Sequence, residues 1–140
     1  MTSLSFHRFW TDRRVVAASG ICRLLVVDDN MMGAAAVVEL LTQEGFDTRY
    51  ASGGLDAVDL VQHWIPEIIL LDINMPMYDG FQTARILRRL VATGESAIIA
   101  HTAQAEDDIH DRGISAGFDA YCRKGASSEA LIWIVRALMR

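Results

Sequence analysis

The stretch that decides the fold is Ile68-Ile-Leu-Leu-Asp72-Ile-Asn-Met-Pro-Met-Tyr-Asp-Gly80. Its first four residues form a short apolar run, which is typical of a strand buried on both faces of a sheet. Such a strand would place the carboxylate of Asp72 at the edge of the sheet, where open α/β folds keep their ligand sites. The Pro-, Asp- and Gly-rich residues that follow predict a turn. Asp72 is therefore the first candidate for a functional residue.

Length and composition predict a single globular domain with an acidic body. The chain has 140 residues, of which 51% are hydrophobic, and a second folded domain would lack material. Its net charge is −5. Residues 1–20 carry Arg8, Arg13 and Arg14 against Asp12, so the rest of the chain is more acidic still. We therefore expect no nucleic-acid-binding surface in the main body.

The sequence predicts a cytoplasmic protein that binds no membrane. The longest apolar run near the N-terminus, residues 15–18, is too short for the core of a signal peptide, and no stretch approaches the length of a membrane span. Cys22 and Cys122 lie in or beside predicted strands, where a thiol is usually a small buried apolar group. A reducing compartment fits this use of cysteine.

Strand and helix patterns alternate five times between residues 23 and 139. The predicted strands are 24–27, 46–51, 68–71, 97–100 and 120–122. The predicted helices run from about 31 to 44, from 55 to 65, from 81 to 91, up to 117, and from 128 to 139. Parallel neighbours need crossover connections, and those crossovers are right-handed. The alternation therefore predicts an α/β fold, with a parallel sheet covered by helices on both faces.

Residues 1–20 carry no pattern long enough to assign. They mix Phe6, Phe9 and Trp10 with three arginines and end in Ala-Ala-Ser-Gly. The segment could be a partly ordered tail, a linker from an upstream module, a helix that docks on the domain or on a second copy, or a mis-assigned start. We accordingly divide the chain into an N-terminal extension or linker, residues 1–20, and one domain, residues 21–140.

Charged and hydroxyl side chains follow four of the five predicted strands. Asp28 and Asp29 follow the first, Asp72 the third, Thr102 the fourth and Lys124 the fifth. The carboxyl ends of parallel strands share one edge, so these side chains are expected to converge. Crowded carboxylates repel one another unless a cation lies between them. A hard divalent ion, Mg²⁺ or Mn²⁺, fits such oxygen ligands.

This constellation is suited to phosphoryl transfer. Asp72 could attack phosphorus and form an aspartyl phosphate. Lys124 and Thr102 would then supply charge and a hydrogen bond to the transferred group. Each residue alone has a simpler explanation, as a helix cap, a turn residue or a solvated side chain. Their convergence on one edge of the sheet is what favours a site.

The same residues resemble the receiver domain of bacterial response regulators in two-component signalling, over about residues 23–139. The matching motifs are Leu-Val-Val-Asp28-Asp29 for the acidic pair, Leu-Leu-Asp72-Ile-Asn-Met-Pro-Met-Tyr-Asp-Gly80 for the phosphoacceptor loop, Ala100-His-Thr102-Ala for the switch threonine, and Ala120-Tyr121-Cys-Arg-Lys124 for the aromatic residue and lysine. The resemblance implies a flavodoxin-like (βα)5 fold, a doubly wound parallel sheet with strand order 2-1-3-4-5.

The resemblance also implies the roles of the acidic residues. Asp72 would receive a phosphoryl group from a histidine kinase or a histidine phosphotransfer protein. Mg²⁺ would be held by Asp29, Asp72 and the backbone carbonyl of Asn74, with Asp28 acting mainly through water. The chain would be a signalling switch that assists its own phosphorylation and dephosphorylation, and not a turnover enzyme.

In this family the switch lies beside the phosphoacceptor. Thr102 would move toward the phosphoryl group and Tyr121 would follow inward, while the side chains of Asn74 and Gln104 would tune dephosphorylation. The change would reshape the face of the fourth helix, fifth strand and last helix, which would bind a target protein or a second receiver. Helical spacing places Trp133 outward on the last helix, where it would either belong to that docking face or lie against a neighbouring segment.

One residue departs from the family pattern. Gly125 follows Lys124, where the family commonly has a proline joined by a cis peptide bond. A cis bond to a residue other than proline costs about 2.5 to 4 kcal/mol. Either the bond is trans and Lys124 is reoriented, or the fold holds a costly cis geometry.

Two other functions stay open at this point. The chain could be the receiver module of a hybrid histidine kinase, with Ala-Ala-Ser-Gly before the first strand as an interdomain junction. Outside the family, it could be an aspartate-nucleophile phosphatase of the haloacid-dehalogenase type. Such a phosphatase needs a second Asp two residues after the nucleophile, and this chain has Asn74 there.

Overall fold

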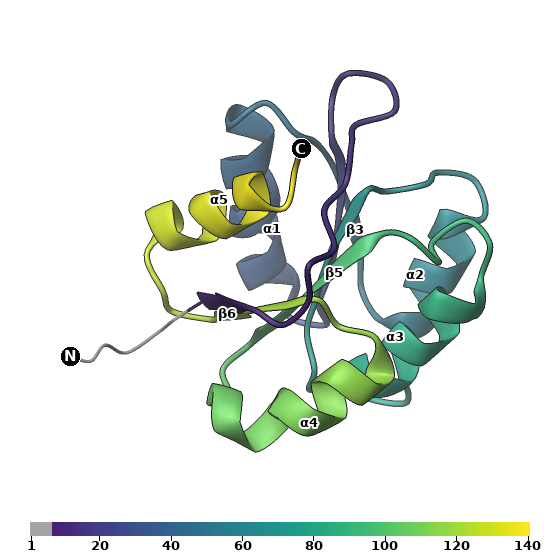
Figure 1. Cartoon of the computed structure of the whole chain (residues 1–140), viewed down its shortest axis with the longest axis vertical. Helices are drawn as coiled ribbons and strands as arrows, with labels where there is room; N and C mark the ends of the chain where they lie inside the picture. The colour runs from purple at the N-terminus through teal and green to yellow at the C-terminus, as the bar shows by residue number, and fades with distance from the viewer. Residues whose placement is uncertain (1–6) are drawn as a thin grey trace.

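A six-stranded sheet runs through the centre of the computed structural model, which describes residues 7–140 (Figure 1). The strands are β1 (His7–Phe9), β2 (Arg23–Val27), β3 (Asp47–Ala51), β4 (Ile68–Leu71), β5 (Ala97–Thr102) and β6 (Ala120–Arg123). Their order across the sheet is β1-β6-β5-β4-β2-β3. Strands β2 to β6 are parallel, and their order confirms the predicted 2-1-3-4-5 of the flavodoxin-like fold.

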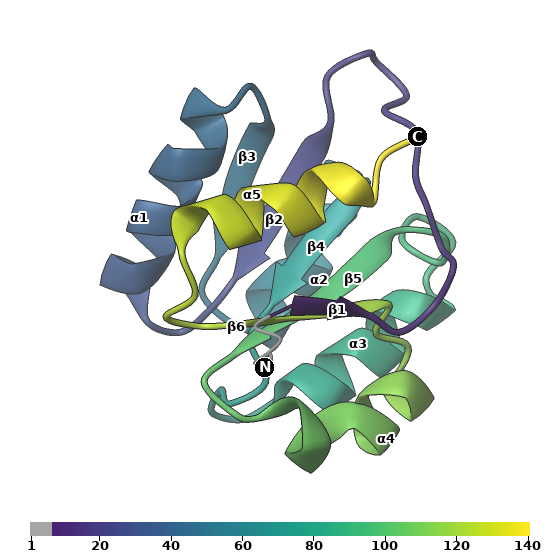
Figure 2. The ribbon, with the colours of Figure 1, turned by 60° about the vertical axis from the view of Figure 1, so that its left-hand side comes forward.

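The five helices form two layers, one on each face of the sheet (Figure 2). They are α1 (Met31–Gln43), α2 (Gly54–Val61), α3 (Gly80–Arg89), α4 (Glu106–Ala116) and α5 (Ser128–Ala137). Helices α1 and α5 cover one face, and α2, α3 and α4 cover the other. None of the helices within residues 7–140 has the length and apolar character needed to cross a membrane.

Strand β4 is buried on both faces, as its apolar run predicts. Ile69 and Leu71 belong to the core beneath α2, α3 and α4, whereas Ile68 and Leu70 belong to the core beneath α1 and α5. All four side chains are at most 1% exposed. Because side chains alternate between the faces of a strand, only a continuous apolar run can fill both cores.

Local capping contacts place the start of α1, α3 and α5. Asn30 accepts a hydrogen bond from the backbone N–H of Gly33 and caps α1. Asp79 caps α3 in a reciprocal pair with Gln82, and Ser127 caps α5. Such caps satisfy backbone donors that have no partner inside the helix. They fix where the strand-to-helix loops end.

Strand β1 adds a sixth strand that the sequence analysis did not predict. It pairs antiparallel with β6, and Arg8 lies opposite Tyr121. From β1 the chain runs along the side of the domain, where Val15 exchanges backbone hydrogen bonds with the end of the chain after α5. Of the four expectations for residues 1–20, the docking helix is wrong for residues 7–9, because this segment docks on the domain as a strand.

Candidate functional site

Three carboxylates meet at the carboxyl ends of β2 and β4. Asp28 and Asp72 are each 5% exposed, whereas Asp29 is exposed. Each residue offers one oxygen, and these oxygens all lie within 4.8 Å of one another. The convergence predicted from sequence is therefore present for the acidic residues. Clustered carboxylate oxygens are the ligands that Mg²⁺ and Mn²⁺ prefer, so the donor set fits a hard divalent ion.

The turn after β2 holds Asp28 in place. Its Oδ1 accepts a hydrogen bond from the backbone N–H of Asn30 at 2.9 Å. Its backbone carbonyl accepts a hydrogen bond from the hydroxyl of Tyr50 at 2.8 Å, and Tyr50 lies on the neighbouring strand β3. Sequence reasoning did not find Tyr50, because a single tyrosine in a weak strand pattern carries no sign of its partner.

Asp72 lies where three segments approach one another closely. Its backbone N–H donates to the carbonyl of Val27, and its Oδ1 accepts from the N–H of Asn74 at 3.4 Å. The first residue of α3, Gly80, packs directly on this strand end. A methyl group there would collide with the backbone carbonyl of Asp72 and lie 2.7 Å from Cα of Ile73. The glycine thus lets α3 begin immediately beside the candidate nucleophile.

Lys124 reaches both buried carboxylates. Its Nζ lies 2.7 Å from Oδ2 of Asp28 and 3.2 Å from Oδ2 of Asp72. No peptide bond among residues 7–140 is cis, so the bond to Gly125 is trans. Gly125 has a φ of +88°, a left-handed conformation that glycine adopts without a steric cost. Of the two expectations for this bond the trans geometry is found, and the lysine still points into the site.

Burial and charge shift the pKa values of this pair. Burial raises the pKa of Asp72, and so does the charge of Asp28, while Lys124 opposes the shift. Burial lowers the pKa of Lys124, but the hydrogen bond to Asp28 and the charge of Asp72 outweigh it, so that this pKa is raised. The ammonium is therefore held in its charged form between two acidic groups.

Thr102, Gln104 and Tyr121 form a second group that touches the first. Thr102 is fully buried, and its hydroxyl oxygen accepts a hydrogen bond from the N–H of Gln104 at 3.2 Å. The hydroxyl of Tyr121 donates to the carbonyl of Gln104 at 2.6 Å. The backbone carbonyl of Thr102 accepts from the N–H of Lys124 at 2.8 Å, which joins the two groups.

Comparison with known proteins identifies the family that has this arrangement. The response regulator receiver domain family matches residues 24–136 of the chain. The chain belongs to this family. Response regulator MprA of Mycobacterium sp. (strain KMS) is 34% identical over 120 residues, which are 84% of this chain and 50% of the relative. MprA of Mycobacterium bovis (strain BCG / Pasteur 1173P2) is 33% identical over the same share of each chain. The receiver domain thus spans about half the length of the curated relatives that it matches.

Solved structures agree with the fold of this receiver domain. The chemotaxis protein CheY4 of Vibrio cholerae has a TM-score of 0.81 at 22% identity, covering 84% of this chain and 98% of the other. The receiver domain of the Francisella response regulator 1452 has a TM-score of 0.75 at 28% identity, covering 84% of this chain and 95% of the other. The protein is therefore a signalling module of the two-component class.

Within this receiver domain, the most unexpected contact to the group of Thr102, Gln104 and Tyr121 is made by Trp10. Its indole ring stacks on Tyr121, with ring centroids 5.9 Å apart and an interplanar angle of 18°. Tyr121 is only 1% exposed. The sequence offered one sign of this contact, the pair Phe9-Trp10 in an otherwise polar stretch, but nothing in the pattern shows which surface the pair covers.

Proposed function

We propose that this receiver domain is a phosphoacceptor and that Asp72 takes a phosphoryl group from a phosphohistidine of a histidine kinase or a histidine phosphotransfer protein. A carboxylate oxygen of Asp72 would form a bond to phosphorus while the bond between phosphorus and the imidazole nitrogen breaks. The observation that carries the proposal is the position of Asp72, a buried carboxylate at the end of the central strand β4 with Lys124 and two further carboxylates beside it.

The acidic residues fit a divalent cation. Asp28, Asp29 and Asp72 would hold Mg²⁺ or Mn²⁺, together with the backbone carbonyl of Asn74. When bound, the ion would offset the negative charge that an anionic phosphoryl donor brings to an acidic site. The side chain of Asn74 is exposed in the loop after β4, where it and Gln104 would tune the lifetime of the acyl phosphate.

Lys124 and Thr102 would act on the transferred group. The ammonium of Lys124 is held charged next to Asp72, so it would stabilise the negative equatorial oxygens of the phosphoryl group. The hydroxyl of Thr102 would donate a hydrogen bond to one of them. Phosphorylation and loss of the phosphoryl group would both depend on these residues, and the domain would act as a switch rather than a turnover enzyme.

The signal would leave through the face formed by α4, β6 and α5, which would bind a target protein or a second receiver domain. Trp133 lies on the outer side of α5 and is 53% exposed. Its ring also contacts His7 and Phe9 of β1, at centroid distances of 4.9 and 5.8 Å. Trp133 therefore lies against the N-terminal segment, as one of the two expectations states, and its part in a docking face stays a prediction that its exposure supports.

The phosphoacceptor assignment is tested by labelling. Incubation with Mg²⁺ and acetyl phosphate should add one phosphoryl group that is stable in acid and labile in base, detected by intact-protein mass spectrometry. Asp72→Asn should abolish it. Asp79→Asn is the matched control, because this acid lies in the same loop but caps α3, and asparagine caps a helix equally well. Labelling that survives Asp72→Asn would contradict the proposal.

A further inference from the structure

Residues 7–15, here called the N-terminal strap, cover the face that would carry the output. The strap begins as β1 on the outer edge of β6 and then passes along the side of the domain (Figure 2). Its contacts fall on α4, β6 and α5, the three elements of that face, and on the loops before β5 and β6. The face is thus occupied by a segment of the same chain.

Trp10 fits a recess between β6 and α4. Its ring stacks on Tyr121 and meets the imidazole of His110 edge-on at 5.4 Å. Its indole N–H donates to Oε2 of Glu106 at 2.7 Å. On α4, Gly113 leaves the space for the indole, since a methyl group there would lie 2.5 Å from Cζ3 of Trp10. The contact is therefore complementary in shape and in hydrogen bonding.

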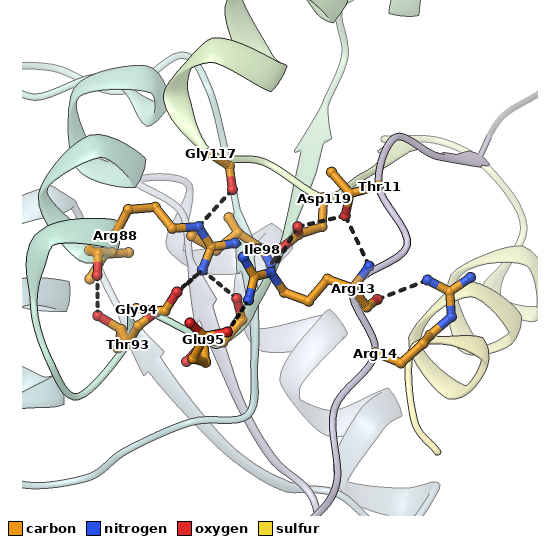
Figure 3. A network of polar contacts seen from close by, with 12 residues as sticks. Thr11, Arg13, Arg14, Arg88, Thr93, Gly94, Glu95, Ile98, Gly117 and Asp119 are labelled. Carbon is orange, nitrogen blue, oxygen red and sulfur yellow. Dashed lines mark hydrogen bonds and ion pairs between the residues drawn. The ribbon is translucent and has the colours of Figure 1, made fainter.

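Charged groups hold the strap at both ends of this recess. Arg8 forms an ion pair with Glu106 at 2.9 Å. Past Trp10, Figure 3 shows Thr11 and Arg13 converging on the buried carboxylate of Asp119. The side-chain oxygen of Thr11 lies 2.7 Å from Oδ1 of Asp119, and Nε of Arg13 lies 3.0 Å from the same oxygen. The strap is a docked segment with specific contacts along its length.

A continuous chain of contacts joins the strap to the phosphoacceptor site. Trp10 stacks on Tyr121, the hydroxyl of Tyr121 donates to the carbonyl of Gln104, and the N–H of Gln104 donates to the hydroxyl of Thr102. Glu106, which binds the indole N–H, begins α4 two residues after Gln104. A displacement of the segment between Thr102 and Glu106 would therefore act on Trp10 twice, through Glu106 and through the carbonyl that holds the hydroxyl of Tyr121.

We propose that the N-terminal strap is an intramolecular ligand of the α4–β6–α5 face, and that a phosphoryl group on Asp72 releases it. This inference rests on the proposed function of Asp72. The strap fits the arrangement in which the Thr102 hydroxyl accepts from Gln104. Once Thr102 moves toward a phosphoryl oxygen, its hydroxyl oxygen would be drawn away from the N–H of Gln104, the segment before α4 would shift, and the recess for Trp10 would change shape.

The coupling must act in both directions. A ligand that favours one of two conformations opposes any ligand that favours the other, by the same factor. The docked strap would therefore weaken the binding of phosphoryl analogues at Asp72, and its removal would strengthen it. Between two sites such coupling typically changes affinity by about 5- to 150-fold.

Hydrogen exchange measures the release directly. The backbone N–H groups of Trp10 and Thr11 both donate to the carbonyl of Asp119, so a docked strap protects them. With Mg²⁺ and beryllium fluoride, a peptide spanning residues 7–14 should exchange faster, while a peptide from α2 serves as the internal reference. Binding of beryllium fluoride is followed in the same samples by ¹⁹F NMR.

The outcomes separate the two proposals. Faster exchange of the strap with bound beryllium fluoride supports the inference. Bound beryllium fluoride with unchanged or slower exchange overturns the inference and leaves the phosphoacceptor role intact. Failure to bind beryllium fluoride, together with failure to label with acetyl phosphate, overturns both.

Substitutions test the coupling from the strap side. Trp10→Ala should raise the affinity for beryllium fluoride about fivefold or more, and Trp10→Phe, which keeps an aromatic ring on Tyr121, should give a smaller rise.

His7→Cys provides the opposite change, because residue 7 lies directly opposite Cys122 in the register of β1 and β6. A disulfide between the introduced thiol and Cys122 would lock the strap and lower the affinity, and reduction should restore it. Equal affinity in all these forms would overturn the inference.

Discussion

The ammonium of Lys124 lies closer to Asp28 than to the candidate nucleophile, with Nζ–Oδ2 distances of 2.7 and 3.2 Å. The lysine thus takes one oxygen from each of two carboxylates that would also hold a divalent ion. The ammonium of Lys124 and a divalent ion would therefore compete for the same carboxylate oxygens. The balance between them can be measured.

Replacing Lys124 with alanine should therefore change two properties in opposite directions. Mg²⁺ should bind about tenfold more tightly, because a competing positive charge within about 4 Å is removed. Phosphorylation of Asp72 by acetyl phosphate should slow by at least about tenfold, because the charge on the transferred group loses a partner. Isothermal titration and a labelling time course measure the two effects. Lys124→Arg keeps the charge as a control, and weaker Mg²⁺ binding in the alanine variant would contradict the competition.

His101 should make the domain less stable in mild acid. Burial, and to a smaller extent Lys124, lower the pKa of this imidazole from 6.5 to about 4. Between these values the unfolded chain binds a proton that the folded chain does not, so stability is lost as the pH falls from about 6.5 to 4. The total loss is about 3 kcal/mol. Urea unfolding at several pH values should show that His101→Gln removes this part of the pH dependence, whereas His63→Gln, at an exposed site, should leave it unchanged.

Asp119 should be the most costly acid to remove outside the proposed phosphoacceptor site. It is 2% exposed and pairs with Arg88 from α3 as well as with Arg13 of the strap (Figure 3). Asp119→Ala should lower the free energy of unfolding by about 3 to 5 kcal/mol, because the guanidinium of Arg88, whose side chain is only 16% exposed, loses its carboxylate partner.

The matched control for Asp119 is Glu95→Ala. Glu95 also pairs with Arg13, at 2.7 Å, but its side chain is 96% exposed. A solvent-exposed ion pair adds little stability, so this variant should unfold nearly as the unmodified chain does. Equal losses in the two variants would contradict the role given to burial.

Gly80→Ala should damage the fold and the site together. The added methyl group would meet backbone atoms of Asp72 and Ile73, which cannot move aside as a flexible side chain can. A loss of about 1 to 3 kcal/mol is expected from such overpacking, together with slower labelling of Asp72. Gly53→Ala is the control, since its methyl group would meet nothing within 4 Å and its φ of 176° is open to any residue. A Gly80→Ala variant with unchanged labelling would be evidence against the close approach.

The sequence predicted the parts of the molecule that depend on local patterns. Apolar runs mark β2, β4 and β5 because each must fill two cores, and the acids that follow β2 and β4 are brought together by the parallel sheet itself. The sequence predicted the convergence of Asp28, Asp29 and Asp72 for this reason.

Other features depend on partners far along the chain. The three residues of β1 carry no alternating pattern, and their partner strand lies more than 100 residues away. Tyr50 and Trp10 are placed by packing against Asp28 and Tyr121. The direction of Lys124 depends on the left-handed conformation of the next residue, Gly125. No rule of residue spacing predicts these positions from the sequence alone.

The pairing of β1 with β6 also bears on how the protein behaves in concentrated solution. A parallel sheet ends in two outer strands whose free backbone groups can join the sheet of another molecule, which is a common start of aggregation. On one side β1 already satisfies that pairing. Release of the strap would therefore expose the outer edge of β6 for as long as Asp72 stays phosphorylated. A longer-lived signal would then also make the protein less soluble.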